Sequence, residues 1–99
     1  MSLSKNQLKF LRARCHDLKP VIWMGQKGLT EEVLSELEIA LEHHELVKIK
    51  LGTDDKEQRK RLMDEICEKS LSEKIQSIGK TVSIFRQNTK NPVIELPKK

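Results

Sequence analysis

The sequence has few aromatic residues, few cysteines and no long apolar run. Among 99 residues there are one Trp, two Phe and no Tyr. Two cysteines are too few for the disulfide framework of a small secreted domain. No apolar stretch approaches the roughly 20 residues of a membrane-spanning helix, and the N-terminus lacks the apolar segment of a secretory signal. We therefore expect a cytoplasmic protein with no membrane partner.

The length and composition favour one folded domain over residues 1–99. Compact domains mostly run from about 50 to 250 residues, so a separate cofactor domain does not fit. Hydrophobic residues make up 36% of the chain and charged residues 34%, which is too apolar for a disordered tail. Residues 87–99 are expected to form a polar tail of this domain.

Charge is unevenly distributed along the chain. The net charge is only +4, which permits a nucleic-acid partner without requiring one. The basic excess lies in residues 1–20 and 74–99, with smaller contributions from residues 21–29 and 46–51. Residues 30–45 hold six Glu and no Lys or Arg. This pattern predicts one basic and one acidic face, the acidic run being mainly the solvated side of a helix.

Three segments have the capping residues and apolar spacing of helices. Ser4 and Gln7 form a capping box before a helix that is expected to continue almost to Pro20. Thr30 caps a second helix ending near residue 44, and Asp54 or Asp55 caps a third ending near residues 70–72. The buried stripe of the second helix is predicted to be Val33, Leu37, Ala40, Leu41 and His44.

Four segments have the pattern of strands, namely residues 21–24, 46–51, 74–78 and 81–86. In the second of them, Val47, Ile49 and Leu51 alternate with Lys48 and Lys50. This alternation predicts a half-buried strand with a basic exposed face.

The order of elements predicts an α/β fold, α-β-α-β-α-β-β, with a mixed four-stranded sheet packed by helices. Strands that alternate with helices imply crossovers and parallel neighbours. Gly79-Lys80 suits the tight turn of a closing antiparallel hairpin. In the tail, residues 93–96 are predicted to add an edge strand.

The junction between the first strand and the second helix carries the most informative motif, Gly25-Gln26-Lys27-Gly28. Paired glycines let a ligand approach the backbone closely, and Lys27 adds a mobile positive charge. A following helix directs unpaired N–H groups toward such a loop, which suits a phosphate. G-x-x-G loops clamp nucleic-acid backbone in the KH module, but two nearby glycines also occur in plain turns. The spacing alone leaves both interpretations open.

The sequence contains four notable blocks: Leu18-Lys19-Pro20; Gly25-Gln26-Lys27-Gly28-Leu29-Thr30; His44-Glu45-Leu46-Val47-Lys48-Ile49-Lys50; and Ile78-Gly79-Lys80 followed by Phe85-Arg86. In this order and spacing they resemble the CRM domain, which occurs alone in bacterial YhbY-like proteins and in several copies in plant organellar splicing factors. The resemblance covers roughly residues 3–97. Phe85 stands where a Tyr is usual, and Trp23-Met24 replaces a more usual polar and β-branched pair.

The resemblance implies a fold similar to the C-terminal domain of bacterial translation initiation factor three. It also implies binding to ribosomal RNA and association with precursors of the large ribosomal subunit, with no cofactor and no small-molecule substrate. A monomer is expected. The RNA-binding residues it implies are Gly25, Gln26, Lys27 and Gly28, supported by Lys48, Lys50 and Arg86, with Arg12, Lys19, Lys5, Lys9 and Arg14 extending the contact.

Other function classes have weaker support in the sequence. Cys15 and Cys67 lie on apolar stripes, so buried thiols are favoured over nucleophiles, and no catalytic residue is predicted. Two Cys and three His lack the spacing of a zinc site, so no metal is expected. An adaptor that binds a protein through the acidic second helix is the main alternative. With so few aromatics, Trp23 and Phe85 are assigned to the core and base stacking is expected to be limited.

Overall fold

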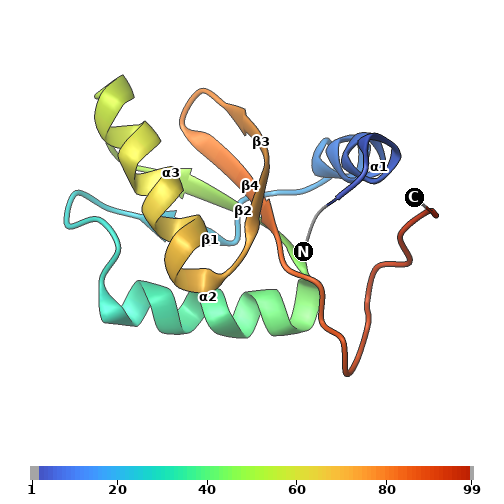
Figure 1. Cartoon of the computed structure of the whole chain (residues 1–99). Coiled ribbons are helices and arrows are strands. Elements are labelled where there is room, and N and C mark those ends of the chain that lie inside the picture. The colour runs from blue at the N-terminus through green and yellow to red at the C-terminus, as the bar shows by residue number, and fades with distance from the viewer. Residues whose placement is uncertain (1–2, 99) are drawn as a thin grey trace.

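The computed structural model describes residues 3–98, and its elements follow the predicted order α-β-α-β-α-β-β (Figure 1). None of the helices within these residues is long and apolar enough to cross a membrane. The elements are α1 (Lys5–Cys15), β1 (Ile22–Met24), α2 (Glu31–His44), β2 (Leu46–Leu51), α3 (Lys56–Ser70), β3 (Glu73–Ile78) and β4 (Thr81–Phe85).

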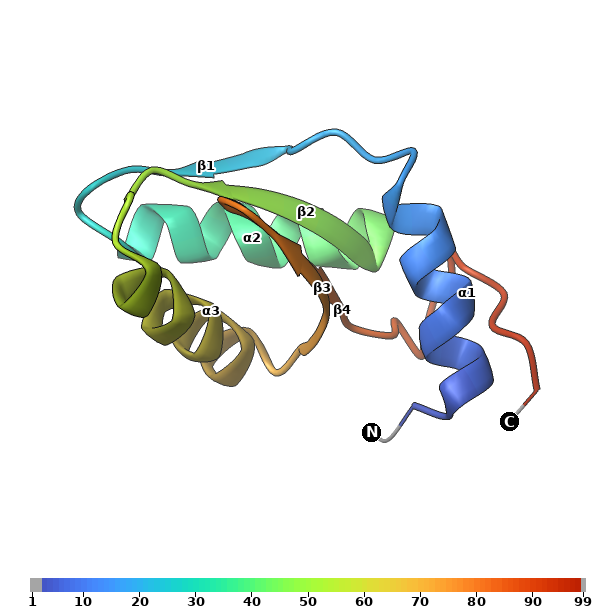
Figure 2. The same cartoon turned by 90° about the horizontal axis from the view of Figure 1, so that it is seen from above.

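The four strands form one mixed sheet in the order β1-β2-β4-β3. β1 runs parallel to β2, whereas β4 is antiparallel to both β2 and β3. α2 and α3 pack on one face of the sheet, and α1 lies at one end (Figure 2). The predicted mixed four-stranded α/β fold is confirmed.

Local capping chemistry sets the helix starts as the sequence predicts. The Ser4 hydroxyl accepts a hydrogen bond from the Gln7 backbone N–H at 3.2 Å, and the Gln7 side chain accepts one from the Ser4 N–H at 3.1 Å. Thr30 caps α2, and Asp55 rather than Asp54 caps α3. The predicted extension of α1 almost to Pro20 is wrong, because the chain tightens into i to i+3 turns after Cys15.

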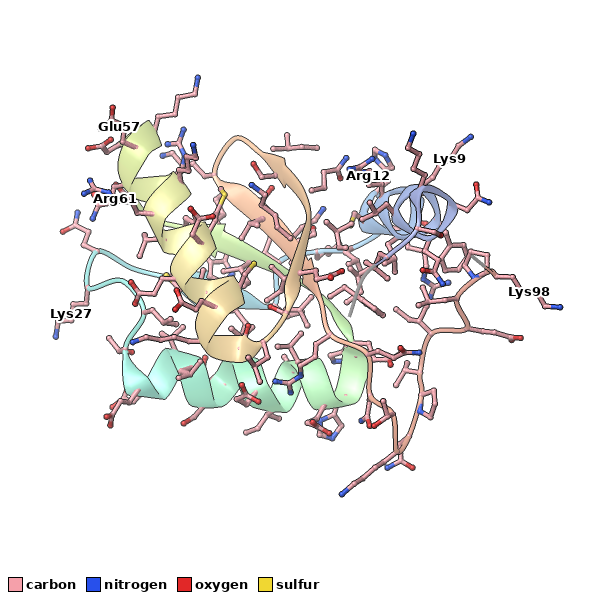
Figure 3. All side chains as sticks on the ribbon, viewed as in Figure 1. Lys9, Arg12, Lys27, Glu57, Arg61 and Lys98 are labelled. Carbon is pink, nitrogen blue, oxygen red and sulfur yellow. The ribbon has the colours of Figure 1, made fainter. Side chains whose placement is uncertain are left out.

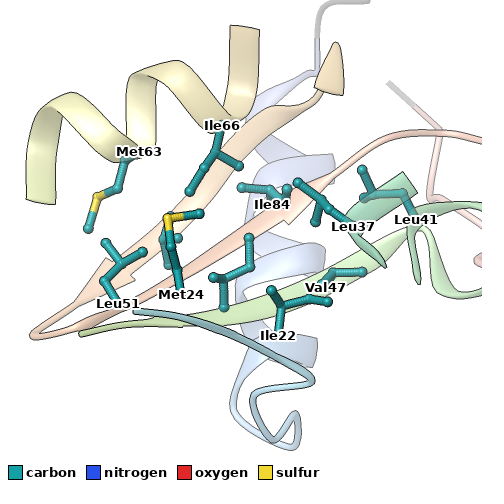
Figure 4. Close-up of a cluster of buried hydrophobic side chains, with 11 residues drawn as sticks. Ile22, Met24, Leu37, Leu41, Val47, Leu51, Met63, Ile66 and Ile84 are labelled. Carbon is teal, nitrogen blue, oxygen red and sulfur yellow. The ribbon is translucent and has the colours of Figure 1, made fainter. Parts of the chain in front are cut away.

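The main core lies between the sheet and the helices α2 and α3 (Figure 4). Val47, Ile49 and Leu51 face this core, as their alternation with lysines predicts. A second cluster lies beneath α1 and is formed by Leu11, Cys15, Leu46, Ile75, Phe85 and Ile94. The two clusters occupy opposite faces of the sheet, and the second covers only one end of its face.

The predicted edge strand over residues 93–96 does not form. Instead the tail docks as irregular chain, with Ile94 buried in the cluster beneath α1. The fully buried Glu45 carboxylate accepts hydrogen bonds from the backbone N–H groups of Asn88 at 2.6 Å, Val93 at 2.8 Å and Ile94. Because the Glu45 carboxylate accepts hydrogen bonds from these N–H groups, they do not need a neighbouring strand as a partner.

Trp23 is not in the core, contrary to the prediction, whereas Phe85 is. Ile22 and Met24 point into the main core, so strand alternation places Trp23 on the opposite face, where it is 67% exposed. His44 is also exposed rather than part of the buried stripe of α2.

Candidate functional site

The loop from Gly25 to Gly28 is a tight turn that presents Lys27 to solvent. The Gly28 N–H donates to the Gly25 carbonyl oxygen at 3.1 Å, and Gly28 has a φ of 74°, a conformation that strongly favours glycine. A Cβ atom on Gly25, by contrast, would meet nothing within 4 Å. Figure 3 shows Lys27 projecting from one end of the molecule. The turn thus requires Gly28, while Gly25 leaves backbone accessible to a ligand.

Gly52, just after β2, fixes the base of this loop. Its N–H donates to the Met24 carbonyl oxygen at 2.7 Å. A Cβ atom on Gly52 would lie 2.9 Å from that oxygen, which is too close for any side chain. The loop therefore leaves the sheet at a site where two backbone segments touch.

The loop lies beside the first half of α3, a segment that the sequence motifs did not place in the site. A Cβ on Gly28 would contact the Leu62 side chain at 3.4 Å, and the neighbouring Arg61 projects at the same end of the molecule as Lys27 (Figure 3). Both cations are exposed. Within residues 3–98 neither one forms an ion pair.

A groove between α3 and the β3–β4 hairpin continues this basic surface. Four of its lining side chains are cationic and one is a carboxylate. The lining residues are Lys56, Glu57, Arg59, Lys60, Met63, Lys74, Ser77 and Gly79. The sequence signal was four bases within residues 56–61. Summing the charge over residues 52–73 concealed it, because that segment also holds seven acids.

The N-terminus of α2 contributes less to anion binding than the motif predicts. The Thr30 hydroxyl accepts a hydrogen bond from the Val33 N–H at 3.2 Å. Glu31 and Glu32 occupy the first turn and are exposed, so their charge already complements the helix dipole. Attraction for an anion at this end therefore comes mainly from cationic side chains.

Lys48 and Lys50 share the face of β2 opposite the main core, as predicted. The Lys48 ammonium group donates to the Cys15 carbonyl oxygen at 2.9 Å, which ties β2 to the end of α1. The Lys50 ammonium group lies 5.2 Å from the centre of the Trp23 ring. Lys48 therefore has an internal partner, whereas Lys50, which is also half-buried, lies beside an aromatic ring.

The Arg86 side chain is held by internal partners and is not an open cationic site. Its guanidinium donates to Glu38 at 2.8 Å, to Glu42 at 3.3 Å and to the Ser70 carbonyl oxygen at 2.9 Å. Two carboxylates neutralise the charge, and the side chain is only 20% exposed. Arg86 thus joins α2 to the end of α3, and we do not include it in the candidate site.

The cations of α1 lie away from the loop. Arg12 donates to the Ile75 carbonyl oxygen at 3.2 Å, and Figure 3 shows Lys9 and Arg12 at the opposite end from Lys27. Lys19 is exposed between α1 and β1. The residues assigned to one site from sequence are therefore distributed over two ends of the molecule. Lys5 and Arg14 are also exposed on α1.

The two cysteines lie among apolar side chains, as their positions on apolar stripes predict. Cys15 is buried in the cluster beneath α1, and burial raises the pKa of the Cys67 thiol, which disfavours the reactive thiolate. Among residues 3–98, no group of three or more His, Cys, Asp or Glu side chains is placed to hold a metal ion.

Comparison with known proteins identifies the family. The family model described as the CRS1 / YhbY (CRM) domain matches residues 3–86 of the chain. The chain therefore belongs to the CRM domain family. The CRM match includes the Gly25–Gly28 loop and all of α3, and it ends before the tail that Glu45 holds.

Named relatives match the chain over nearly its whole length. A Pseudomonas aeruginosa protein named "Probable RNA-binding protein" is 46% identical over 90 residues, covering 91% of this chain and 86% of that protein. A Haemophilus influenzae protein named "RNA-binding protein" is 38% identical over 98 residues, covering 99% of this chain and 98% of that protein. The solution structure of a Staphylococcus aureus protein, described as a candidate RNA-binding protein, has a TM-score of 0.82 at 30% identity and covers 97% of this chain and 100% of that one.

Proposed function

We propose that this chain binds RNA through the Gly25–Gly28 loop and the cationic first half of α3. The observation that carries the proposal is the shared position of Lys27 and Arg61, which project from one end of the molecule without ion-pair partners among residues 3–98. The groove lined by Lys56, Lys60 and Lys74 extends the same surface. Relatives named "Probable RNA-binding protein" and "RNA-binding protein" give independent support.

Phosphate contacts supply most of the affinity in this proposal. Lysine and arginine side chains neutralise phosphates and release counterions, so affinity falls as salt concentration rises. The turn leaves the Gly25 backbone accessible to a phosphate oxygen. Such contacts recognise the shape of RNA more than its sequence.

We also propose that the RNA is ribosomal, within precursors of the large subunit in the cytoplasm, and that the chain acts there as a monomer. The family resemblance supports this finer assignment. Sedimentation of a cell extract on a gradient tests it. Comigration with free large-subunit precursors is the expected result, and a protein that stays at the top of the gradient contradicts it.

The adaptor alternative has less support because several carboxylates of the acidic segment have internal partners. Glu38 and Glu42 pair with Arg86, and Glu45 is buried against the tail. Only part of the acidic surface predicted from the sequence is therefore available to a protein partner.

Replacing Lys27 by Ala tests the RNA contact directly. A charge-assisted contact is worth about 1–2 kcal/mol, so affinity for a structured ribosomal RNA fragment should fall by about fivefold or more. The slope of log affinity against log salt should shrink by about one unit. Fluorescence anisotropy at several salt concentrations measures both quantities.

Lys98→Ala is the matched control, since this exposed lysine lies at the opposite end of the molecule (Figure 3). It should leave affinity and salt slope unchanged. Equal losses of RNA affinity in both variants would show that binding depends on net charge alone. The loop would then not be the RNA-binding site.

A further inference from the structure

The face of the sheet opposite the main core carries an open row of side chains. Strand register aligns Trp23 with Lys50, Lys50 with Thr81, and Thr81 with Ile78. Paired residues in a sheet point to the same face, so these four side chains cross all four strands in one line. The next row, containing Lys48 and the buried Ser83, lies nearer α1.

No helix among residues 3–98 covers this row. Figure 2 shows β1 and the adjacent part of β2 unobstructed, with α2 behind them and α1 at the far end. Trp23 is 67% exposed and Ile78 is 60% exposed. An indole is among the largest apolar side chains, and exposed apolar patches on small proteins commonly mark contact surfaces.

The Lys50 ammonium group lies 5.2 Å from the centre of the Trp23 ring. This arrangement indicates which kind of ligand the surface can bind. A cation over an aromatic ring is attracted by the ring's negative face. One ammonium group can cover only one face of the indole, which leaves ring surface open to solvent. An aromatic surface next to a positive charge matches a nucleotide, which combines a flat base with a phosphate.

Trp23 is also continuous with the proposed RNA contact. It precedes Gly25 by two residues and Lys27 by four, and four residues span at most about 14 Å. One short single-stranded segment can therefore contact both the ring and the loop. The other two aromatic residues do not compete for this role, because Phe85 is buried and Phe10 packs beneath Arg14.

We propose that Trp23, with Lys50 beside it, is a stacking platform for an unpaired base of RNA. This proposal rests on the proposed RNA-binding function and adds a preference for single-stranded segments. The scarcity of aromatic residues predicted that base stacking contributes little to binding. The proposed platform differs from that prediction. Thr81 and Ile78 would form the remainder of the platform.

The test compares single-stranded and duplex RNA of equal length. Base–aromatic stacking is worth enough to change affinity by about fivefold to a hundredfold. Trp23→Leu should therefore weaken binding to an unstructured oligoribonucleotide by at least fivefold and binding to the duplex by less than twofold. Trp23→Phe keeps a ring and should retain most of the single-strand affinity.

The single tryptophan also provides a direct signal. Single-stranded RNA should quench its fluorescence strongly, whereas inorganic polyphosphate, which has charge but no bases, should quench it little. Melting followed by circular dichroism should be unchanged in Trp23→Leu, because the side chain lies outside the core.

The outcomes separate the two proposals. If Lys27→Ala weakens binding but Trp23→Leu does not, the platform is wrong and the phosphate contact stands. If the wild-type chain binds neither RNA, the proposed function fails, and the platform with it. Equal quenching by polyphosphate, or a Trp23-dependent dimer seen by sedimentation without RNA, would also overturn the platform.

Discussion

At the scale of single residues, Glu45 contributes more to the folded structure than its position at the end of a helix indicates. It ends α2 with a φ of 61°, and its carboxylate is buried under three backbone N–H donors of the tail. A buried carboxylate is stable only when hydrogen bonds replace its hydration. The tail supplies those bonds, so the residue and the tail depend on each other.

Replacing Glu45 by Gln should destabilise the protein by about 2–3 kcal/mol, because an amide NH₂ would face backbone donors and charge-assisted bonds would be lost. Chemical denaturation measures the change in the free energy of unfolding. Glu95→Gln, at an exposed position of the tail, is the control and should be neutral. An equally small effect at Glu45 would show that the tail does not depend on this carboxylate.

At the scale of elements, the sequence predicted what is local. The capping box of α1, the alternation in β2 and the Gly79-Lys80 hairpin depend on residues a few positions apart, and all three are found. The docked tail and the ion pairs of Arg86 join residues more than 40 positions apart. No local pattern indicates such partners, which is why the tail was assigned a strand and Arg86 a place in the site.

For the same reason, the sequence predicted only part of the candidate site. The Gly25–Gly28 loop is visible as a motif, but its neighbour in space is α3, which follows it by about 30 residues. Trp23 was assigned to the core because aromatic residues are usually buried. Its exposure follows from alternation in a strand of only three residues, too short for a pattern to be recognised.

The two glycines of the loop should respond differently to alanine. Gly28→Ala places a side chain at a φ of 74° and should cost about 1–2 kcal/mol of stability. Gly25→Ala has open space and should leave stability unchanged while weakening RNA binding, since a methyl group would separate the backbone from a phosphate. Thermal melting and anisotropy of both variants test this difference. Unchanged binding in Gly25→Ala would mean that RNA does not approach this backbone.

At the scale of the whole molecule, two groups of cations lie at opposite ends. One contains Lys27, Arg61 and the groove beside α3, and the other lies on α1 with Lys9 and Arg12 (Figure 3). A net charge of +4 describes neither group. Electrostatic attraction of RNA depends on where cations gather, so the ends should contribute unequally.

Lys60→Ala and Arg12→Ala test this inequality, since both remove one exposed positive charge. Lys60→Ala, in the groove, should lower RNA affinity and reduce the salt slope by about one unit. Arg12→Ala should change the slope by much less. Titrations of the same RNA at matched salt concentrations measure both slopes, and equal reductions would extend the interface to α1.

The docked tail also determines where the two ends of the described chain lie. The Gln7 side chain of α1 donates to the Pro97 carbonyl oxygen at 3.1 Å, and both ends of the described chain lie on the side of α1, away from the loop that follows β1 (Figure 2). A fluorophore or an immobilising tag attached at either terminus would therefore leave the loop unobstructed. A donor and acceptor dye pair on the two termini would report release of the tail as a loss of energy transfer.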